Sequence, residues 1–330
     1  MTDPAYSVLV LGCGNIAGRF DERRPAEAPP LTHAGAFAKH GGFILSACLD
    51  PDSNRGSEFG RYWGVARIAS NFDDLYARVG EFDVISICSP TSCHAAHLER
   101  AITLRPRLIF CEKPLTASAS DSIRLVDACE ARGIALVVNY TRRWDPSAVS
   151  ISAELKAGHW GEIRSVVGYY NKGIFNNGGH MLDLLIRILG PLEVVAAIGR
   201  RVDFANEDPT VAALLQSVEG RVPVTLCPGD ARDYAFFELE VLCGRGALRM
   251  GGGGMFWEVR EAVPSAEFAG YRSLCKPIEM QGRYVEAMTN AAANIYNFLS
   301  RGEVLAVTGQ DACQVQQLCS DIYSASVHAT

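Results

Sequence analysis

Short apolar runs alternate with longer amphipathic segments over the first 140 residues. The runs are four to seven residues long and lack polar alternation, as strands buried on both faces of a sheet do. They are Tyr6–Leu11, Phe43–Leu49, Asp83–Cys88, Leu108–Cys111 and Ala135–Val138. The intervening segments are long enough for helices, so the pattern predicts βαβ units and a doubly wound parallel sheet.

The pattern changes after Trp144. From Leu192 onward, strand-like runs follow one another without helices between them, which predicts an antiparallel or mixed sheet in an α+β domain. Strand-like runs are Ile163–Tyr170, Leu192–Ile198, Val211–Val218, Val222–Cys227 and Phe236–Cys243, and helical patterns cover Ser150–Ala157, His180–Leu189, Tyr284–Leu299 and Ala312–Val327. We expect two domains, residues 1–140 and 141–330, with the C-terminal helix packed back on the first.

The segment Arg19–Thr32 interrupts the first pattern. It is charged and contains three prolines, so it forms no regular helix. Its position close to a glycine-rich loop is compatible with a lid over a ligand and with a solvated surface loop, and the second is the ordinary role of such a segment.

The composition limits the classes of function. The 330 residues include 31 basic and 37 acidic side chains, so a net charge of −6 leaves no broad basic surface for nucleic acid or an anionic membrane. No apolar run resembles a membrane span or a signal peptide, and we expect a cytoplasmic protein. The 11 cysteines include Cys48, Cys88, Cys111 and Cys243 in apolar runs and form no CxxC pair, which predicts buried thiols rather than disulfides or a zinc site.

A glycine-rich loop directly follows the first predicted strand. Gly12 and Gly14 match the first two glycines of a dinucleotide-binding fingerprint, one for a tight turn and one for close approach of a pyrophosphate to backbone N–H groups. Those N–H groups would be the ones of Asn15 and Ile16. The third fingerprint position falls on Ala17, where a small residue suffices for helix packing.

Asp50 ends the second predicted strand. A carboxylate there would accept hydrogen bonds from an adenosine ribose, and it repels a 2′-phosphate, which favours NAD over NADP. Arg55 is close enough in sequence to leave NADP open. The alternative is a structural role, in which Asp50 is a turn residue before Pro51-Asp52-Ser53.

Several further blocks occur in a characteristic order. They are Ser89-Pro90-Thr91 with His94, Phe110–Pro114, Asn139–Pro146, Gly158–Ile163 and His180–Leu185. Together they resemble the glucose–fructose oxidoreductase / inositol dehydrogenase / rhizopine-catabolism oxidoreductase family, from Val8 to about Ser324. The resemblance implies a Rossmann domain followed by a domain with an open-faced, mostly antiparallel sheet, NAD(P)-dependent hydride transfer on sugars or cyclitols, and homodimers or homotetramers packed through that sheet.

The resemblance and the loop together assign the candidate site residues. The expected cofactor contacts are Gly12, Gly14, Asn15, Ile16, Asp50, Ser89, Pro90, Thr91, His94, Glu112 and Lys113. The expected substrate contacts are Lys113, Arg143, Lys172, Asn176, Asn177, His180 and Asp183. His94 and His97 have the spacing of metal ligands, but no carboxylate or thiolate cluster completes a site, and we expect no metal.

Lys113 is a candidate catalytic residue. The Glu112-Lys113-Pro114 block follows a buried strand, and ligands of open α/β sheets bind at the carboxyl ends of strands. An ammonium there donates to a reacting oxygen, and the resemblance gives Lys113 this role. The alternative is a surface lysine paired with Glu112.

His180 is the second candidate catalytic residue. It opens an apolar helix, and Asp183 follows on the same helical face. A lone histidine among apolar residues is usually a core residue, but the H-x-x-D-L-L block is similar to the family's catalytic helix. The family's aspartate four residues earlier is Asn176 here, and an amide cannot ionise.

Three hypotheses follow. The first is a cytoplasmic dehydrogenase or reductase acting on a CH–OH group of a sugar, a cyclitol or a sugar derivative, including a nucleotide-linked sugar. Lys172 and Arg143 would bind an anionic part of it, and the alternative is that they are residues of a solvated loop. The second, motivated by Asn176, is a nicotinamide-binding sensor or scaffold without turnover. The third is a reductase of another carbonyl or a conjugated imine, as in biliverdin reductases.

Overall fold

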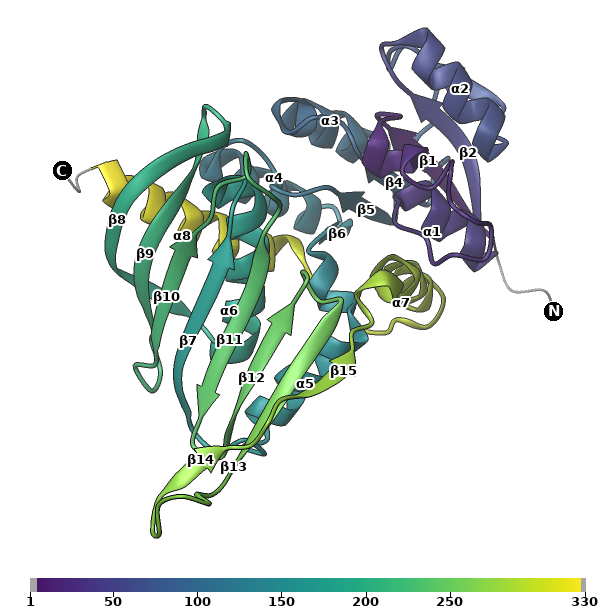
Figure 1. Cartoon of the computed structure of the whole chain (residues 1–330). Helices are drawn as coiled ribbons and strands as arrows, with labels where there is room; N and C mark the ends of the chain where they lie inside the picture. The colour runs from purple at the N-terminus through teal and green to yellow at the C-terminus, as the bar shows by residue number, and fades with distance from the viewer. Residues whose placement is uncertain (1–4, 328–330) are drawn as a thin grey trace. The chain divides into compact units, whose positions relative to one another are not determined.

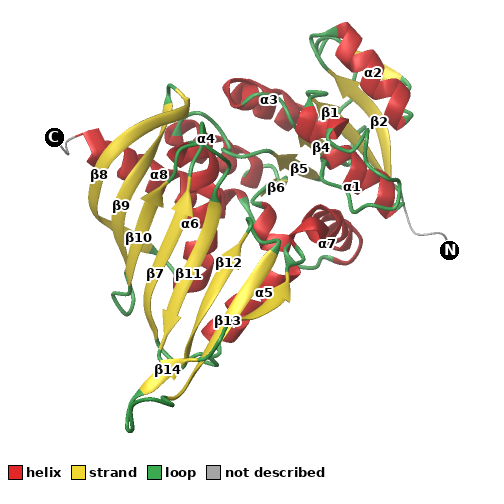
Figure 2. Ribbon diagram, viewed as in Figure 1, coloured by secondary structure: helices red, strands yellow, loops and turns green. Residues whose placement is uncertain are grey.

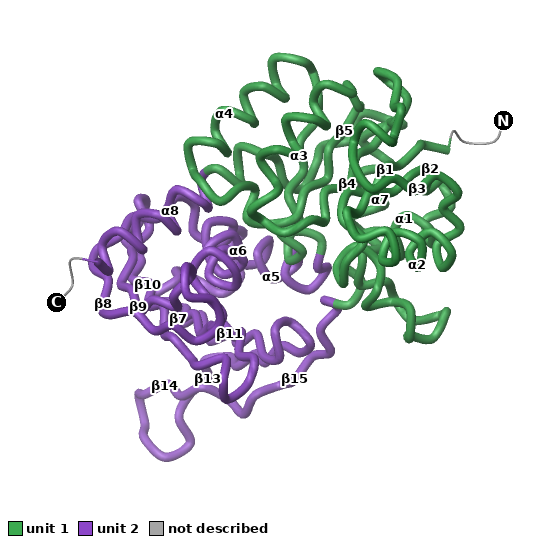
Figure 3. The backbone as a smooth tube through the Cα atoms, turned by 90° about the horizontal axis from the view of Figure 1, so that it is seen from above, with its two compact units in different colours: residues 1–144, 285–313 green, residues 145–284, 314–330 purple. Residues whose placement is uncertain are grey.

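The computed structural model describes residues 5–327, which form two compact units (Figures 1 and 3). The first unit comprises the chain up to Trp144 together with Val285–Cys313. The second comprises Asp145–Tyr284 together with the chain from Gln314 onward. The chain therefore returns to the first unit near its C-terminal end before it finishes in the second.

The first unit is built around a parallel sheet of six strands. Its strand order is β3-β2-β1-β4-β5-β6, so the chain winds outward from β1 to one side and then to the other. The strands are β1 (Tyr6–Leu11), β2 (Phe43–Leu49), β3 (Arg67–Ala69), β4 (Val84–Ile87), β5 (Leu108–Cys111) and β6 (Ala135–Val138). This order confirms the predicted doubly wound Rossmann fold.

Helices connect these strands, and short polar side chains begin them. Thr32, Asp52 and Ser118 each accept a hydrogen bond from a backbone N–H group in the first turn, which satisfies donors that have no partner inside a helix. A late helix packs against α1, where the Tyr296 ring lies 4.6 Å from the His40 ring. The helices are α1 (His33–His40), α2 (Ser53–Trp63), α3 (Thr91–Thr103), α4 (Ala119–Glu130) and the late helix α7 (Ala287–Arg301), with short turns η2 (Thr141–Trp144) and η4 (Tyr284–Glu286).

The second unit is built around a nine-stranded sheet in the order β14-β13-β12-β11-β7-β10-β9-β8, with β15 paired to β13. Neighbouring strands are antiparallel except for β7 and β10. The strands are β7 (Ile163–Tyr170), β8 (Leu192–Ala205), β9 (Asp208–Ser217), β10 (Pro223–Pro228), β11 (Phe237–Cys243), β12 (Gly246–Gly251), β13 (Phe256–Pro264), β14 (Arg272–Leu274) and β15 (Ile278–Gln281). The predicted mostly antiparallel sheet is confirmed.

One face of this sheet packs against helices (Figure 2). Val166 and Tyr170 of β7 are buried there, and at Gly168 a Cβ atom would lie 2.9 Å from Sδ of Met181. Val167, between them, belongs to the opposite face and is half-exposed. The helices are α5 (Pro146–Lys156), α6 (Gly179–Leu189) and α8 (Gly309–Val327).

The structure also tests two expectations from composition, the buried cysteines and the lack of a membrane span. Cys48, Cys88 and Cys111 are buried thiols, whereas Cys243 is half-buried because it ends strand β11 at the sheet's margin. Among residues 5–327, no helix combines the length and the apolar character needed to cross a membrane.

Tyr170 provides a test of how the second sheet is held together. Its buried hydroxyl donates to the carbonyl oxygen of Val211 at 2.7 Å and accepts from the N–H of Val211 at 2.9 Å. Tyr170→Phe leaves both backbone groups buried without these bonds, and we expect it to lower the free energy of unfolding by about 1–3 kcal/mol. Urea denaturation measures this loss. Tyr169→Phe, on the opposite face of the same strand, is the control, and an equal loss in both variants would contradict the assignment.

Candidate active site

The glycine-rich loop joins β1 to a five-residue π-helical turn, η1 (Asn15–Arg19). Gly12 has φ +85°, and a Cβ atom there would lie 2.7 Å from the backbone nitrogen of Ser89, so only glycine fits. A Cβ atom on Gly14, in contrast, would have nothing within 4 Å. This free space beside the loop, next to first-turn amides that have no acceptor inside the turn, fits a pyrophosphate group.

The helix that normally follows such a loop is interrupted in this chain. The turn η1 ends at Arg19, and α1 begins only at His33. The prolines of the intervening segment lack the N–H groups that would continue a helix. The sequence assigned close helix packing to Ala17, and Gly18 is also closely packed. A Cβ atom on Gly18 would overlap the indole of Trp63 in α2.

Asp50 lies at the end of β2 and is 2% exposed. One carboxylate oxygen accepts from the N–H of Cys13 at 2.8 Å, and the other accepts from the N–H of Asp52 at 2.9 Å. Nη1 of Arg55 lies 3.6 Å from that second oxygen. The carboxylate thus connects the glycine-rich loop to the start of α2, and Asp50 makes the turn hydrogen bond that the structural alternative expected.

Ser89, Pro90 and Thr91 lead from β4 into α3, for which Pro90 is the N-cap. The Ser89 hydroxyl pairs with Nδ1 of His97 at 2.9 Å. His94 is 1% exposed, and its ring nitrogens lie 2.8 Å from the Ser89 carbonyl oxygen and 2.9 Å from that of Pro114. His94 therefore ties the segment after β4 to the segment after β5.

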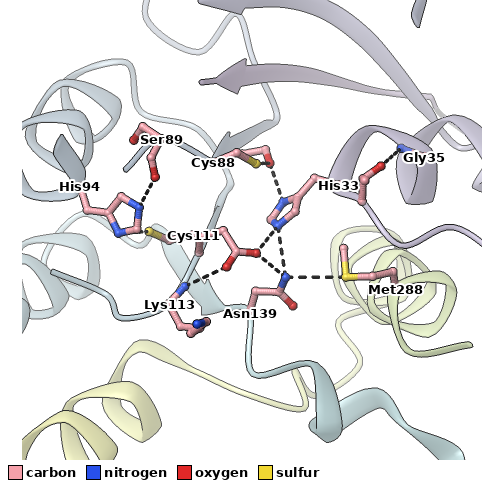
Figure 4. A network of polar contacts seen from close by, with 12 residues as sticks. His33, Gly35, Cys88, Ser89, His94, Cys111, Lys113, Asn139 and Met288 are labelled. Carbon is pink, nitrogen blue, oxygen red and sulfur yellow. Dashed lines mark hydrogen bonds and ion pairs between the residues drawn. The ribbon is translucent and has the colours of Figure 1, made fainter. Parts of the chain in front are cut away.

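The Glu112-Lys113-Pro114 block follows β5, and the Lys113–Pro114 peptide bond is cis. Oε1 of Glu112 lies 3.0 Å from Nε2 of His33 and accepts from Nδ2 of Asn139 at 2.6 Å. Its Oε2 accepts from the N–H of Lys113 at 3.3 Å. Figure 4 shows His33 and Asn139 converging on this position from different elements, beside Lys113.

The two ionisable groups of this cluster stabilise each other's charged form. Burial alone would raise the pKa of Glu112, but the hydrogen bond and charge of His33, with the charge of Lys113, hold it below its usual value. Burial alone would lower the pKa of His33, but contacts with Cys88 and Glu112 outweigh burial and raise it to about 10. An imidazolium and a carboxylate therefore face each other next to Lys113.

The predicted substrate residues of the second unit lie on one loop and the helix after it. The π-helical turn η3 (Gly173–Gly178) precedes α6, and the carboxylate of Asp208 accepts from the N–H groups of Phe175 and Asn176, each at 2.9 Å. The N–H of Gly173 donates to the Thr210 hydroxyl at 2.8 Å. Strand β9 thus fixes the loop that carries Asn176 and Asn177.

His180 is the second residue of α6 and is half-buried, while Asp183, less than one turn later, is 1% exposed. Lys172 precedes the loop with a left-handed backbone (φ +66°), and its Nζ lies 5.6 Å from the centre of the Phe204 ring. Arg143 belongs to the first unit, where its guanidinium lies 3.4 Å from the Asp311 carboxylate. Arg143 is thereby engaged within its own unit.

Two residues of the site had no assigned role from sequence. Asn139 lies inside one of the blocks that resemble the family. Its position directly after β6, at the same sheet edge as Glu112, could have indicated that the two side chains meet. His33 was missed entirely. A histidine opening the first regular helix after the Arg19–Thr32 segment was the only indication, and its partner Glu112 is 79 positions away.

Comparison with known proteins identifies relatives. Residues 6–140 match the oxidoreductase family with an NAD-binding Rossmann fold. The chain is 29% identical over 200 residues to D-apiose dehydrogenase of Rhizobium rhizogenes, covering 56% of this chain and 57% of that protein. It is 25% identical over 264 residues to inositol 2-dehydrogenase of Rhizobium meliloti, covering 72% and 76%. The chain thus spans somewhat more than half of the D-apiose dehydrogenase it matches.

Solved structures resemble the whole chain in fold. The WlbA dehydrogenase from Bordetella pertussis, in complex with NADH and UDP-GlcNAcA, has a TM-score of 0.80 at 19% identity, covering 100% of this chain and 98% of that one. An oxidoreductase from Agrobacterium radiobacter, in complex with NAD+, L-tartaric acid and magnesium, has a TM-score of 0.73 at 20% identity, covering 98% and 97%. Both units therefore have the fold of known dehydrogenases.

The His33–Glu112 pair predicts a pH dependence of stability. Because the pKa of His33 is raised from 6.5 to about 10 on folding, its stabilising contribution is complete below pH 6.5 and is lost as the pH rises through about 10. Between these values the wild-type free energy of unfolding should fall more steeply with pH than that of His33→Gln, as urea denaturation at several pH values measures.

His40→Gln is the matched control, on the same helix. Burial lowers the pKa of His40, so unlike His33 this residue contributes no loss of stability as the pH rises, and its replacement should keep the steep fall of the wild type. Equal slopes for wild type and His33→Gln would show that the pair does not carry charge.

Proposed function

Because residues 6–140 match the oxidoreductase family with an NAD-binding Rossmann fold, we propose that the protein is an NAD(P)-dependent oxidoreductase. It transfers hydride to or from a CH–OH or carbonyl carbon of a sugar, a cyclitol or a sugar derivative, including a nucleotide-linked sugar. The observation that carries this proposal is the free space at Gly14, at the same sheet edge as the Lys113 segment. The named relatives, which include inositol and apiose dehydrogenases, support the substrate class.

The cofactor is NAD, with NADP as the alternative. The loop amides of Asn15 and Ile16 hold the pyrophosphate, and Ser89, Pro90 and Thr91 border the same sheet edge. Asp50 disfavours a 2′-phosphate, but Arg55 lies 3.6 Å from its carboxylate and offers an anion partner. When bound, the nicotinamide supplies or accepts the hydride.

Lys113 and His180 carry the proton chemistry. The Lys113 ammonium donates a hydrogen bond to the reacting oxygen, and the His180 imidazole takes the hydroxyl proton or returns it. Asp183 orients the substrate or the imidazole, and Asn176, Asn177 and Lys172 bind further hydroxyl or anionic groups of the substrate. Asn176 orients a hydroxyl but cannot exchange a proton, so that function belongs to His180.

The open face of the second sheet is the proposed contact between copies of the chain, in a homodimer or homotetramer. Arg249 of β12 lies 2.7 Å from Glu238 of β11 and 3.2 Å from Glu258 of β13. On the same face, Val167 is half-exposed and Leu214 is 39% exposed. Apolar side chains beside an ordered row of charges suit an interface between identical subunits.

Replacement of the proposed proton-transfer groups tests the reaction. We expect His180→Ala and Lys113→Ala each to reduce turnover by about 10²–10⁴-fold while NADH affinity changes little. Absorbance of the reduced nicotinamide, with a panel of sugars and cyclitols, measures turnover. His159→Ala and Lys156→Ala, both exposed, are the controls. Unchanged turnover in both test variants would refute the site, and tight binding without turnover on any substrate would favour the sensor hypothesis.

Gly14 tests the cofactor site separately from the reaction. A valine side chain at Gly14 meets no protein atom close to its Cβ, so Gly14→Val should fold normally but lose at least about tenfold in NADH affinity, since it fills the space of the pyrophosphate. Fluorescence titration measures this affinity. Gly244→Val, at a glycine of the second unit where a Cβ atom meets no heavy atom closer than 3.7 Å, should bind NADH as the wild type does. Wild-type affinity in Gly14→Val would place the cofactor elsewhere.

A further inference from the structure

The segment Arg19–Thr32 is anchored at its end by one carboxylate. Asp21 accepts hydrogen bonds from the N–H groups of Leu31 and Thr32, each at 3.0 Å, and from the Thr32 hydroxyl at 2.6 Å. Thr32 is fully buried, and its hydroxyl oxygen accepts from the N–H of Gly35 at 3.1 Å as the N-cap of α1. The segment thus fixes the first turn of α1, which begins with His33.

The His33 ring has a defined position and no access to solvent. Its exposed fraction is 0%, and it stacks on Phe110 with ring centres 4.2 Å apart. Nδ1 pairs with the Ser86 hydroxyl at 2.8 Å, which leaves Nε2 directed at Glu112 at 3.0 Å. His33 therefore cannot touch a substrate, and any effect on the proposed reaction must pass through Glu112.

Glu112 connects this ring to Lys113. Its Oε1 is held by His33 and Asn139, and its Oε2 by the backbone of Lys113. The charged or titratable groups that face the carboxylate are His33 from α1, Cys111 of β5 and Lys113 itself, and Cys88, after β4, faces His33. Of these groups, His33 and Lys113 are the two that carry a positive charge.

We propose that His33 is a positioning residue for Lys113, acting through Glu112, and that the Arg19–Thr32 segment serves to fix His33. The His33 imidazolium balances the Glu112 carboxylate and restricts it to one orientation. The Lys113 segment is thereby fixed, and its ammonium is spared the full attraction of the carboxylate. This proposal rests on the proposed function only for the importance of Lys113, because the coupling itself is a property of the protein without ligands.

Competitive acylation tests the coupling without a substrate. The protein is labelled with acetic anhydride at about pH 8, where His33 still carries its charge in the wild type, and mass spectrometry of the Lys113 peptide gives the acylation rate of this amine. In His33→Gln the carboxylate of Glu112 loses its positive partner and attracts the Lys113 ammonium more strongly. We expect acylation of Lys113 at this pH to be about tenfold slower than in the wild type, which corresponds to a rise of about one unit in the pKa of the amine.

Two further variants make the result decisive. Asp21→Asn removes the charge that anchors Thr32, so it should slow the acylation of Lys113 in the same way but by a smaller factor. His40→Gln, on the same helix but remote from Glu112, should leave it unchanged. A wild-type acylation rate of Lys113 in folded His33→Gln overturns the proposal, and if that variant does not fold, a wild-type rate in Asp21→Asn overturns it.

Kinetics separate this proposal from the proposed function. If a sugar substrate is found, His33→Gln should lower kcat more than it changes KM and should displace the alkaline limb of the kcat profile to higher pH. If no sugar is turned over, the proposed function fails, while slower acylation of Lys113 in His33→Gln still supports the coupling.

Discussion

The near burial of the Glu112 carboxylate, whose side chain is 12% exposed, is the constraint on which the arrangement of the first unit's site depends. A carboxylate taken out of water is costly unless it is paired and hydrogen-bonded. Here the required partners come from widely separated parts of the chain, His33 at the start of α1 and Asn139 at the end of β6. Satisfying one buried charge therefore aligns the two elements flanking the Lys113 segment.

Contacts to the backbone also hold the segments at this sheet edge together. Gly12 approaches Ser89 too closely for any side chain, and His94 connects the Ser89 and Pro114 carbonyl groups. The segments after β1, β4 and β5 are thus joined directly to one another. Because these are the carboxyl ends of parallel strands, rigidity is concentrated where a doubly wound sheet binds its ligand.

The sequence predicted regular elements better than the contacts between them. The apolar runs located β1, β2, β4, β5 and β6, because strands buried on both faces need continuous apolar side chains. Strand β3 was missed because its three residues are too short for a pattern. The full length of β8 was missed because exposed arginines interrupt its apolar positions. The His33–Glu112 pair was beyond sequence reasoning, since only the folded sheet brings these residues together.

Several carboxylates of this chain accept hydrogen bonds from the backbone N–H groups of loops. Asp21 holds the end of the Arg19–Thr32 segment, Asp50 the glycine-rich loop, and Asp208 the turn before His180. Hydrogen bonds from neutral donors to a charged acceptor are stronger than those between neutral groups, so they can fix loops that lack regular structure. Part of the acidic excess behind the net charge of −6 is therefore used in fixing loops. Because these hydrogen bonds fix irregular segments such as Arg19–Thr32, they also fix the residues that follow those segments in the chain.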